Sequence, residues 1–165
     1  GAYGSGTALN NRAGISDISL SNVRFEANGG TGIRSATSFD PAGSAQIHVG
    51  AGGTGYRFEN ADGSTTGNDL VIGHDYRIEV NGSGTGVRAN THGRVIAQGL
   101  IDIRDADGGS AIVTRSASQV INQGTIRSQS RVAPLIDLRG GETVFINQGT
   151  LDAPYADQVV VAGGA

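Results

Sequence analysis

The sequence predicts an all-β fold, a right-handed parallel β-helix of about six coils with roughly 22–25 residues in each. The heptapeptide VINQGTI (120–126) returns as FINQGTL (145–151), and VIAQGLI (95–101) precedes the first copy by the same step. Glycine supplies 28 of the 165 residues, and no stretch places apolar residues at the i, i+3, i+4 and i+7 positions of an amphipathic helix. A unit this short cannot bury its apolar face alone, so successive units are expected to stack.

The last apolar residue of each heptapeptide marks an anchor that can be followed along most of the chain. Each anchor opens an alternating apolar and polar run, the pattern of a half-buried strand. The positions of successive anchors differ by 22, 31, 23, 25 and 25, so like positions come into register when the units stack. The anchors, which are expected to form one inward column, are Phe25, Ile47, Ile78, Ile101, Ile126 and Leu151.

Two further strands complete each predicted coil. A Gly-rich turn such as GGTG follows the anchor and leads into a second alternating triplet, and the start of the heptapeptide supplies a third strand. With strands about 4.8 Å apart, six coils give a rod on the order of 30 Å long. The second inward column is expected to hold Ile33, Tyr56, Val87, Ile112 and Ile136, and the third is expected to hold Ile96, Ile121 and Ile146.

The longest step between anchors, from Ile47 to Ile78, indicates a loop insertion over residues 60–75. Its first part, NADGSTTGND, has the composition of a surface loop, and its second part, LVIGHDY, is expected to fold back onto the coil. A loop that leaves a regular solenoid costs ordering entropy without adding to the core, so we regard it as a candidate contact for a partner. The candidate contact residues in this region are Asp62, Asn68, Asp69 and Tyr76.

Arg34, Arg57 and Arg88 follow the turn glycines of three successive units. They are expected to stack outward, about 5 Å apart. Such a row could bind acidic glycans or a carboxylate-rich partner. Like charges at this spacing repel one another, and Glu59 and the aspartates of the nearby loop can offset them.

The asparagine of the repeated heptapeptide is predicted to be structural. Asn122 and Asn147 should stack one coil apart at a tight turn, where the amide can bond both its own turn and its neighbour. Ala97 interrupts this column one coil earlier. We therefore expect a short asparagine ladder rather than a ligand site.

An enzymatic alternative depends on the outward column that follows the anchors. In that column Glu79 and Asp102 are adjacent, about 5 Å apart, close enough to share a metal ion or a proton. Solubility alone would also place charges there, and Arg127 can offset Asp102. The stretch DADGG (105–109) does not complete a calcium-loop pattern, and no G-x-S-x-G elbow, Walker loop or Cys–His pair is present. We expect no catalytic residue, metal or cofactor, with a polysaccharide lyase or glycoside hydrolase as the alternative.

Composition limits the classes of partner and the boundaries of the domain. The formal charge of −3 argues against nucleic acid, and the absence of cysteine excludes a disulfide framework. The chain shows neither a signal peptide nor an apolar run of the length, roughly 18 residues, that a membrane-spanning helix needs. QVVVAGGA (158–165) resembles the opening strand of another coil, so residues 1–165 are expected to be one β-helix segment of a longer protein.

The INQGT words of two successive coils, 25 residues apart, and the high glycine content resemble the passenger region of bacterial autotransporters. The likeness is closest to the adhesin-like subgroup with pertactin-type β-helices and covers residues 15–162. It implies a Gram-negative protein that is secreted or displayed at the outer membrane, with a role in adhesion, self-association or virulence. It further implies a host cell-surface protein or glycan, or another copy of the chain, as the partner. Contact with the membrane would be made only through a C-terminal barrel that this sequence does not contain.

Overall fold

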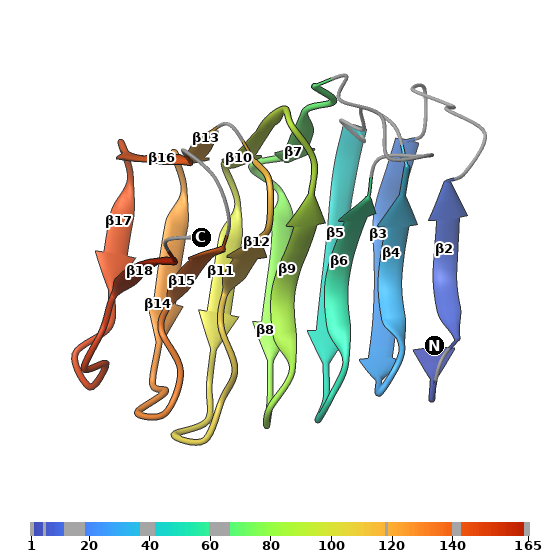
Figure 1. Ribbon diagram of the computed structural model, residues 1–165. Coiled ribbons are helices and arrows are strands. Elements are labelled where there is room, and N and C mark those ends of the chain that lie inside the picture. The colour runs from blue at the N-terminus through green and yellow to red at the C-terminus, as the bar shows by residue number, and fades with distance from the viewer. Residues whose placement is uncertain are drawn as a thin grey trace.

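The computed structural model of the chain is an all-β solenoid, a parallel β-helix (Figure 1). It describes residues 2–4, 6–11, 19–36, 42–59, 67–117, 119–139 and 143–163. These residues form 18 strands, and they contain no helix, so none that could cross a membrane. The predicted fold class is therefore confirmed.

The strands belong to three parallel sheets that run along the rod. Sheet 1 carries the anchors, sheet 2 carries the strands after the glycine turns, and sheet 3 carries the start of each heptapeptide. Sheet 1 consists of β1 (Ala2–Tyr3), β3 (Ser19–Asn28), β5 (Ala42–Val49), β8 (Tyr76–Val80), β11 (Leu100–Ile103), β14 (Thr125–Ser128) and β17 (Thr150–Asp152). Sheet 2 consists of β2 (Thr7–Asn11), β4 (Thr31–Ser35), β6 (Thr54–Glu59), β9 (Thr85–Asn90), β12 (Ile112–Thr114), β15 (Ile136–Arg139) and β18 (Val160–Gly163). Sheet 3 consists of β7 (Leu70–Ile72), β10 (Arg94–Ala97), β13 (Gln119–Asn122) and β16 (Val144–Asn147).

The number of turns is about five rather than six. Six anchors were counted in the sequence, and all six lie on consecutive strands of sheet 1. Six strands delimit only five complete circuits, so counting strands overstated the number of turns by one. Each circuit from β7 onward contains three strands, as predicted; in the earlier circuits part of the corresponding segment lies outside the described residues.

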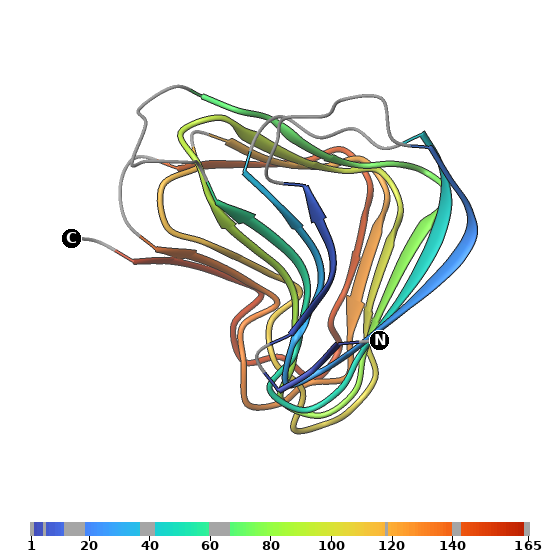
Figure 2. The same ribbon diagram turned by 90° about the vertical axis from the view of Figure 1, so that its right-hand side faces the viewer.

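Two of the three predicted inward columns are confirmed. The anchors pair in register along sheet 1, and Ile47, Ile78, Ile101 and Ile126 are fully buried. The second column likewise pairs in register along sheet 2, from Ile33 through Ile136. Seen along the rod in Figure 2, the two sheets converge at one corner and diverge toward sheet 3, enclosing a thin core.

The predicted third column was wrong by one residue. Val95 and Val120 are fully buried and face inward, whereas Ile96, Ile121 and Ile146 pair in register on the outer face of sheet 3 and are partly exposed. Side chains alternate faces along a strand, so an error of one position moves a whole column from the core to the surface. Both faces of these strands carry apolar residues, so the alternation of apolar and polar residues did not indicate which face is buried.

The corner between sheets 1 and 2 explains the repeated glycine turns. Gly32, Gly55 and Gly86 stack where the sheets converge, and a Cβ on Gly55 would lie 2.7 Å from the Gly86 carbonyl oxygen and 2.9 Å from Ile78 Cγ2. Only glycine fits between the anchor column and the next coil at this point. In the next coil Ala111 takes the equivalent place, and the corner there is a longer loop, residues 104–111.

The predicted insertion is partly a regular element of the coil. Residues 60–66 lie outside the described residues, whereas Leu70 and Ile72 are buried on β7, which pairs with β10. Residues 73–75 then form the corner that leads into β8.

Candidate functional site

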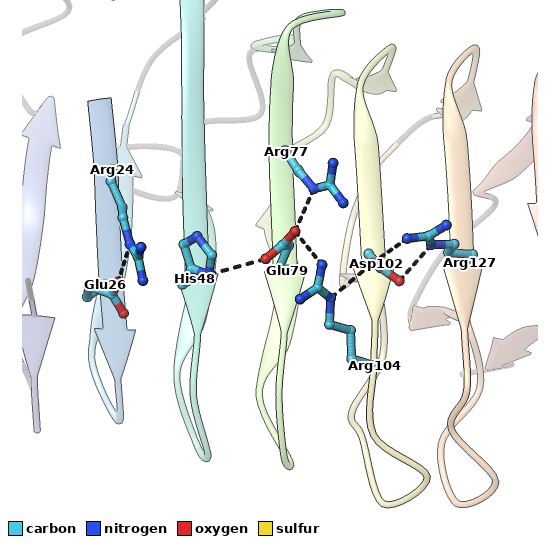
Figure 3. A network of polar contacts seen from close by, with 8 residues as sticks. All are labelled: Arg24, Glu26, His48, Arg77, Glu79, Asp102, Arg104 and Arg127. Atoms are coloured by element: carbon cyan, nitrogen blue, oxygen red, sulfur yellow. Dashed lines mark hydrogen bonds and ion pairs between the residues drawn. The ribbon is translucent and has the colours of Figure 1, made fainter. Parts of the chain in front are cut away.

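The outer face of sheet 1 carries a network of ion pairs (Figure 3). Several of its strands bear charges of opposite sign two residues apart, which places both on the same face. Arg24 donates to Glu26 at 2.5 Å in this way, and Arg77 donates to Glu79 at 2.5 Å. Further bonds cross from coil to coil, so the network joins neighbouring strands.

Glu79 occupies the centre of this network. Its side chain is only 8% exposed, and its Oε1 accepts from Arg77 on the same strand and from Arg104 of the next coil, each at 2.5 Å. The second oxygen lies 3.3 Å from Nδ1 of His48 on the preceding strand. Both oxygens are thus occupied by neighbouring side chains.

Asp102 is held in the same manner. Burial of this side chain, which is 5% exposed, acts to raise its pKa, but hydrogen bonds from Arg127 and Arg104 outweigh burial and lower the pKa below its usual range. Arg127 donates to both carboxylate oxygens, at 2.8 and 2.7 Å, and Arg104 donates at 3.2 Å. A carboxylate fixed in its ionised form by two arginines is a poor general acid.

The pair Glu79 and Asp102 was the basis of the enzymatic alternative. The structure places the two in register on adjacent strands, but arginines lie between and beside their carboxylates. Nor does the described part of the chain contain a cluster of three or more acidic or histidine side chains able to hold a metal ion.

The outer face of sheet 2 is different, because its arginines outnumber its carboxylates. Arg34, Arg57 and Arg88 pair in register on β4, β6 and β9. Glu59 accepts from Arg34 at 3.0 Å and from Arg57 at 2.6 Å, which relieves the repulsion between these two. Arg88 is exposed, and its side chain makes no ion pair or hydrogen bond with the described residues.

Two further arginines lie on this face toward the C-terminal end of sheet 2, in the next outward column, because the register partner of Arg88 on β12 is Val113. Arg115 follows β12 and is exposed, and its side chain likewise contacts no acceptor among the described residues. Arg139 ends β15 and pairs with Asp137 at 2.6 Å. Among the described residues of this face, five arginines therefore accompany two carboxylates, an excess of three positive charges on a chain of net charge −3. We call this surface the arginine face; it consists of Arg34, Arg57, Glu59, Arg88, Arg115, Asp137 and Arg139.

The residue type matters as much as the charge. All twelve basic residues of the chain are arginine. A guanidinium presents a planar fork of donors that matches carboxylate and sulfate groups, whereas lysine presents a point charge. The arginine face is consequently suited to anionic groups that accept two hydrogen bonds.

The remaining candidate contact residues do not form one patch. Asp62 lies outside the described residues. The side-chain hydrogen bond from Arg94 lowers the pKa of Asp69, and the backbone carbonyl of Asn68 accepts from the Thr91 hydroxyl at 2.7 Å. Tyr76 is 1% exposed, so its expected place on the surface is corrected: β8 directs it inward.

Asn122 and Asn147 lie in register on sheet 3. Asn122 Nδ2 donates to Asn147 Oδ1 at 2.8 Å and to the Thr150 carbonyl at 3.1 Å, and its Oδ1 accepts from the backbone of Gly124 at 3.2 Å. A neighbouring ladder of glutamines, which sequence reasoning missed, joins residues 98, 123 and 148 at 3.0 Å per step. The recurrence of Gln once per heptapeptide was the available signal.

A recess on sheet 1 was also missed. It has a volume of about 410 Å³ and lies over β3, β5 and β8 beside the corner before β8. Its lining includes Arg24, Gln46 and Arg77 from the three strands, which we call the floor, and His74 and Asp75 from the corner before β8. The spacing Arg-x-Glu in RFE (24–26) and RIE (77–79) could have marked the two arginines, since period 2 puts each pair on one face.

Comparison of the chain with protein-family models, with curated proteins and with solved structures finds no match.

Proposed function

We propose that this β-helix is a non-catalytic binding segment, displayed at the cell surface or secreted, of the autotransporter passenger type. Its partner is an acidic glycan or an acidic segment of a host surface protein, held on the arginine face. The chain acts in adhesion, and the rod serves to present a long, flat surface.

The observation that carries the proposal is the uncompensated part of the arginine face. Arg88 and Arg115 are exposed, and among the described residues neither guanidinium group has an acceptor. Arg57 is paired with Glu59 and Arg139 is paired with Asp137, but both arginines remain at the surface. Strand spacing sets the register partners Arg34, Arg57 and Arg88 about 4.8 Å apart along the rod, close to the length of one sugar unit in an extended chain.

The ion-pair network on sheet 1 supports the non-catalytic part of the proposal. Hydrolysis of a glycoside in most families requires two carboxylates, one of them protonated. Arg77 and Arg104 engage Glu79, and Arg104 and Arg127 engage Asp102. The carboxylate pair that first suggested an enzyme is thereby used to hold neighbouring coils together.

The experiment measures retention of the protein on immobilised heparin as a function of salt. The double variant Arg88→Gln with Arg115→Gln should lose about tenfold in affinity, and retention of the parent protein should fall with ionic strength. Arg94→Gln is the matched control, because it removes one arginine from sheet 3 and should leave retention almost unchanged. Equal losses in the two proteins would overturn the arginine face as the contact.

A second assay tests catalysis directly. The protein is incubated with heparin and with polygalacturonate, and new reducing ends or unsaturated products are measured. We expect neither. Turnover of either polymer would replace the binding proposal with the carbohydrate-active alternative.

A further inference from the structure

The recess on sheet 1 is a second feature that invites a ligand, on another face from the arginine face. It combines a polar floor with one apolar wall, at a volume of about 410 Å³. Binding sites for small molecules fall in the range of roughly 300–1,000 Å³ and place a few polar groups at fixed positions. The argument for this site is independent of the proposed function.

A β-bulge shapes the recess. The register between β3 and β5 shifts between Leu20 and Val23, and Asn22 in the bulge has φ of 52°, the one positive φ outside glycine among the described residues. The hydroxyl of Ser44 accepts from the Asn22 backbone at 3.2 Å and donates to the Asn22 side chain at 3.3 Å. Bulges re-aim side chains beside functional sites, and these bonds hold the bulge in one form before any ligand arrives.

The bulge is locked from the opposite strand as well. Gly43 lies across from Leu20 with φ of 96°, and a Cβ there would come within 1.8 Å of the Leu20 carbonyl oxygen. Only glycine permits this approach. The recess is thus built into the pairing of two strands and does not depend on a loop.

Two arginines lie on the floor of the recess, one on each side of Gln46. Arg24, Gln46 and Arg77 are register partners on three consecutive strands. Each arginine uses its Nε to bond the carboxylate two residues further on, Glu26 or Glu79, at 2.5 Å. The terminal nitrogens of both guanidinium groups make no hydrogen bond with the described residues, so they keep donors for an anion while the Nε bond holds each group in place (Figure 3).

The other walls complete a mixed surface. Leu100 is the register partner of Arg77 and supplies an apolar contact, while Gln46 is exposed on the floor. His74 and Asp75 contribute further hydrogen-bonding groups from the corner before β8. A sugar ring presents hydroxyls at its edge and an apolar face, and it can use every one of these groups.

We propose that the recess binds a carboxylated monosaccharide unit. The carboxylate lies against the terminal nitrogens of Arg77, the ring lies over Gln46 and against Leu100, and Arg24 donates to hydroxyl oxygens at the far end. Asp75 is the single carboxylate among the described lining residues, so the recess does not offer the two carboxylates of a hydrolase.

The test compares methyl glucuronide with methyl glucoside, which differ only in the carboxylate, by two-dimensional NMR of the intact chain. Glucuronide should shift the amides of Arg24, Gln46, Arg77 and Leu100 with a dissociation constant on the order of 1 mM. Glucoside should bind at least tenfold more weakly. Arg77→Gln should weaken glucuronide binding at least tenfold, and Arg94→Gln, an arginine of similar exposure that is also ion-paired, should not change it.

Gln46→Glu places a carboxylate on the exposed position between the register partners Arg24 and Arg77, where it can occupy the donors that would otherwise hold the sugar carboxylate. The new charge on the floor should abolish glucuronide binding. Equal binding of the two sugars, equal effects of the two arginine variants, or an unsaturated product would overturn the proposal. Because the double variant of Arg88 and Arg115 should bind glucuronide normally, failure of the arginine face and failure of the recess are separate results.

Discussion

Arg127 donates two hydrogen bonds to Asp102, its register partner one coil earlier on sheet 1. The contact joins two strands that the backbone ladder already pairs. It resembles the bond from Arg104 to Glu79, which also crosses one coil. The outer charges of this sheet therefore reinforce the stacking of coils, and this arrangement leads to several expected outcomes.

Acid should weaken the fold through Asp102. Since the pKa of Asp102 is lowered in the folded chain, its contribution is fully present above the unfolded value of about 3.9 and is lost as pH falls through the lower folded pKa. Asp102→Asn should cost about 1–3 kcal/mol at neutral pH. Urea denaturation at several pH values should show the gap between parent and variant closing below about pH 4. A stability difference between parent and variant that stays constant with pH would contradict a lowered pKa for Asp102.

Substitutions at two adjacent residues can test which side chains of sheet 3 face the core. Val95 is fully buried and Ile96 is partly exposed on the outer face. Val95→Asp places an unpaired charge in the core and should cost several kcal/mol, whereas Ile96→Asp should cost about 1 kcal/mol or less. Thermal melts followed by circular dichroism distinguish the two. The reverse order would restore the column that the sequence first suggested.

The glycine column predicts a penalty for a single methyl group. Gly55→Ala puts a Cβ against the Gly86 carbonyl and against Ile78, and overpacking of this kind costs about 1–3 kcal/mol. Ala111→Gly, at the equivalent place two coils later, should change the free energy of unfolding by less. Chemical denaturation of the two variants provides the comparison, and equal costs would argue against close contact at this corner.

The asparagine ladder should be unequal along its length. Asn122 is buried and bonds Asn147, Thr150 and Gly124, so Asn122→Ala should cost about 1–3 kcal/mol. Asn147 is exposed and should tolerate the same change with a smaller loss. Melting temperatures of the two variants give the result, which would be contradicted by a larger shift for Asn147.

The anchors were predictable because the alternation within each strand and the spacing between coils assign the same residues to the core. Alternation sets which residues of a strand face inward, and the constant step from coil to coil brings Ile101 and Ile126 into the same column. In VIAQ and VINQ the first two residues are both apolar. Alternation therefore does not show whether Val95 or Ile96 faces the core.

The candidate sites were less accessible to sequence reasoning. The row of Arg34, Arg57 and Arg88 follows from equal offsets after the glycine turns. The recess depends on a register shift at Leu20 and on the φ of Asn22, which belong to the pairing of two strands and leave no pattern in either one.

The repeated pairing surface has a consequence for how rods of this kind can change length. The units that begin at Val95 and Val120 present the same columns to their neighbours, position by position. Loss or duplication of one such unit by recombination would leave the flanking coils able to pair with each other. The length of the rod would change by about 4.8 Å with the core intact, so evolution can adjust this length without redesigning the fold.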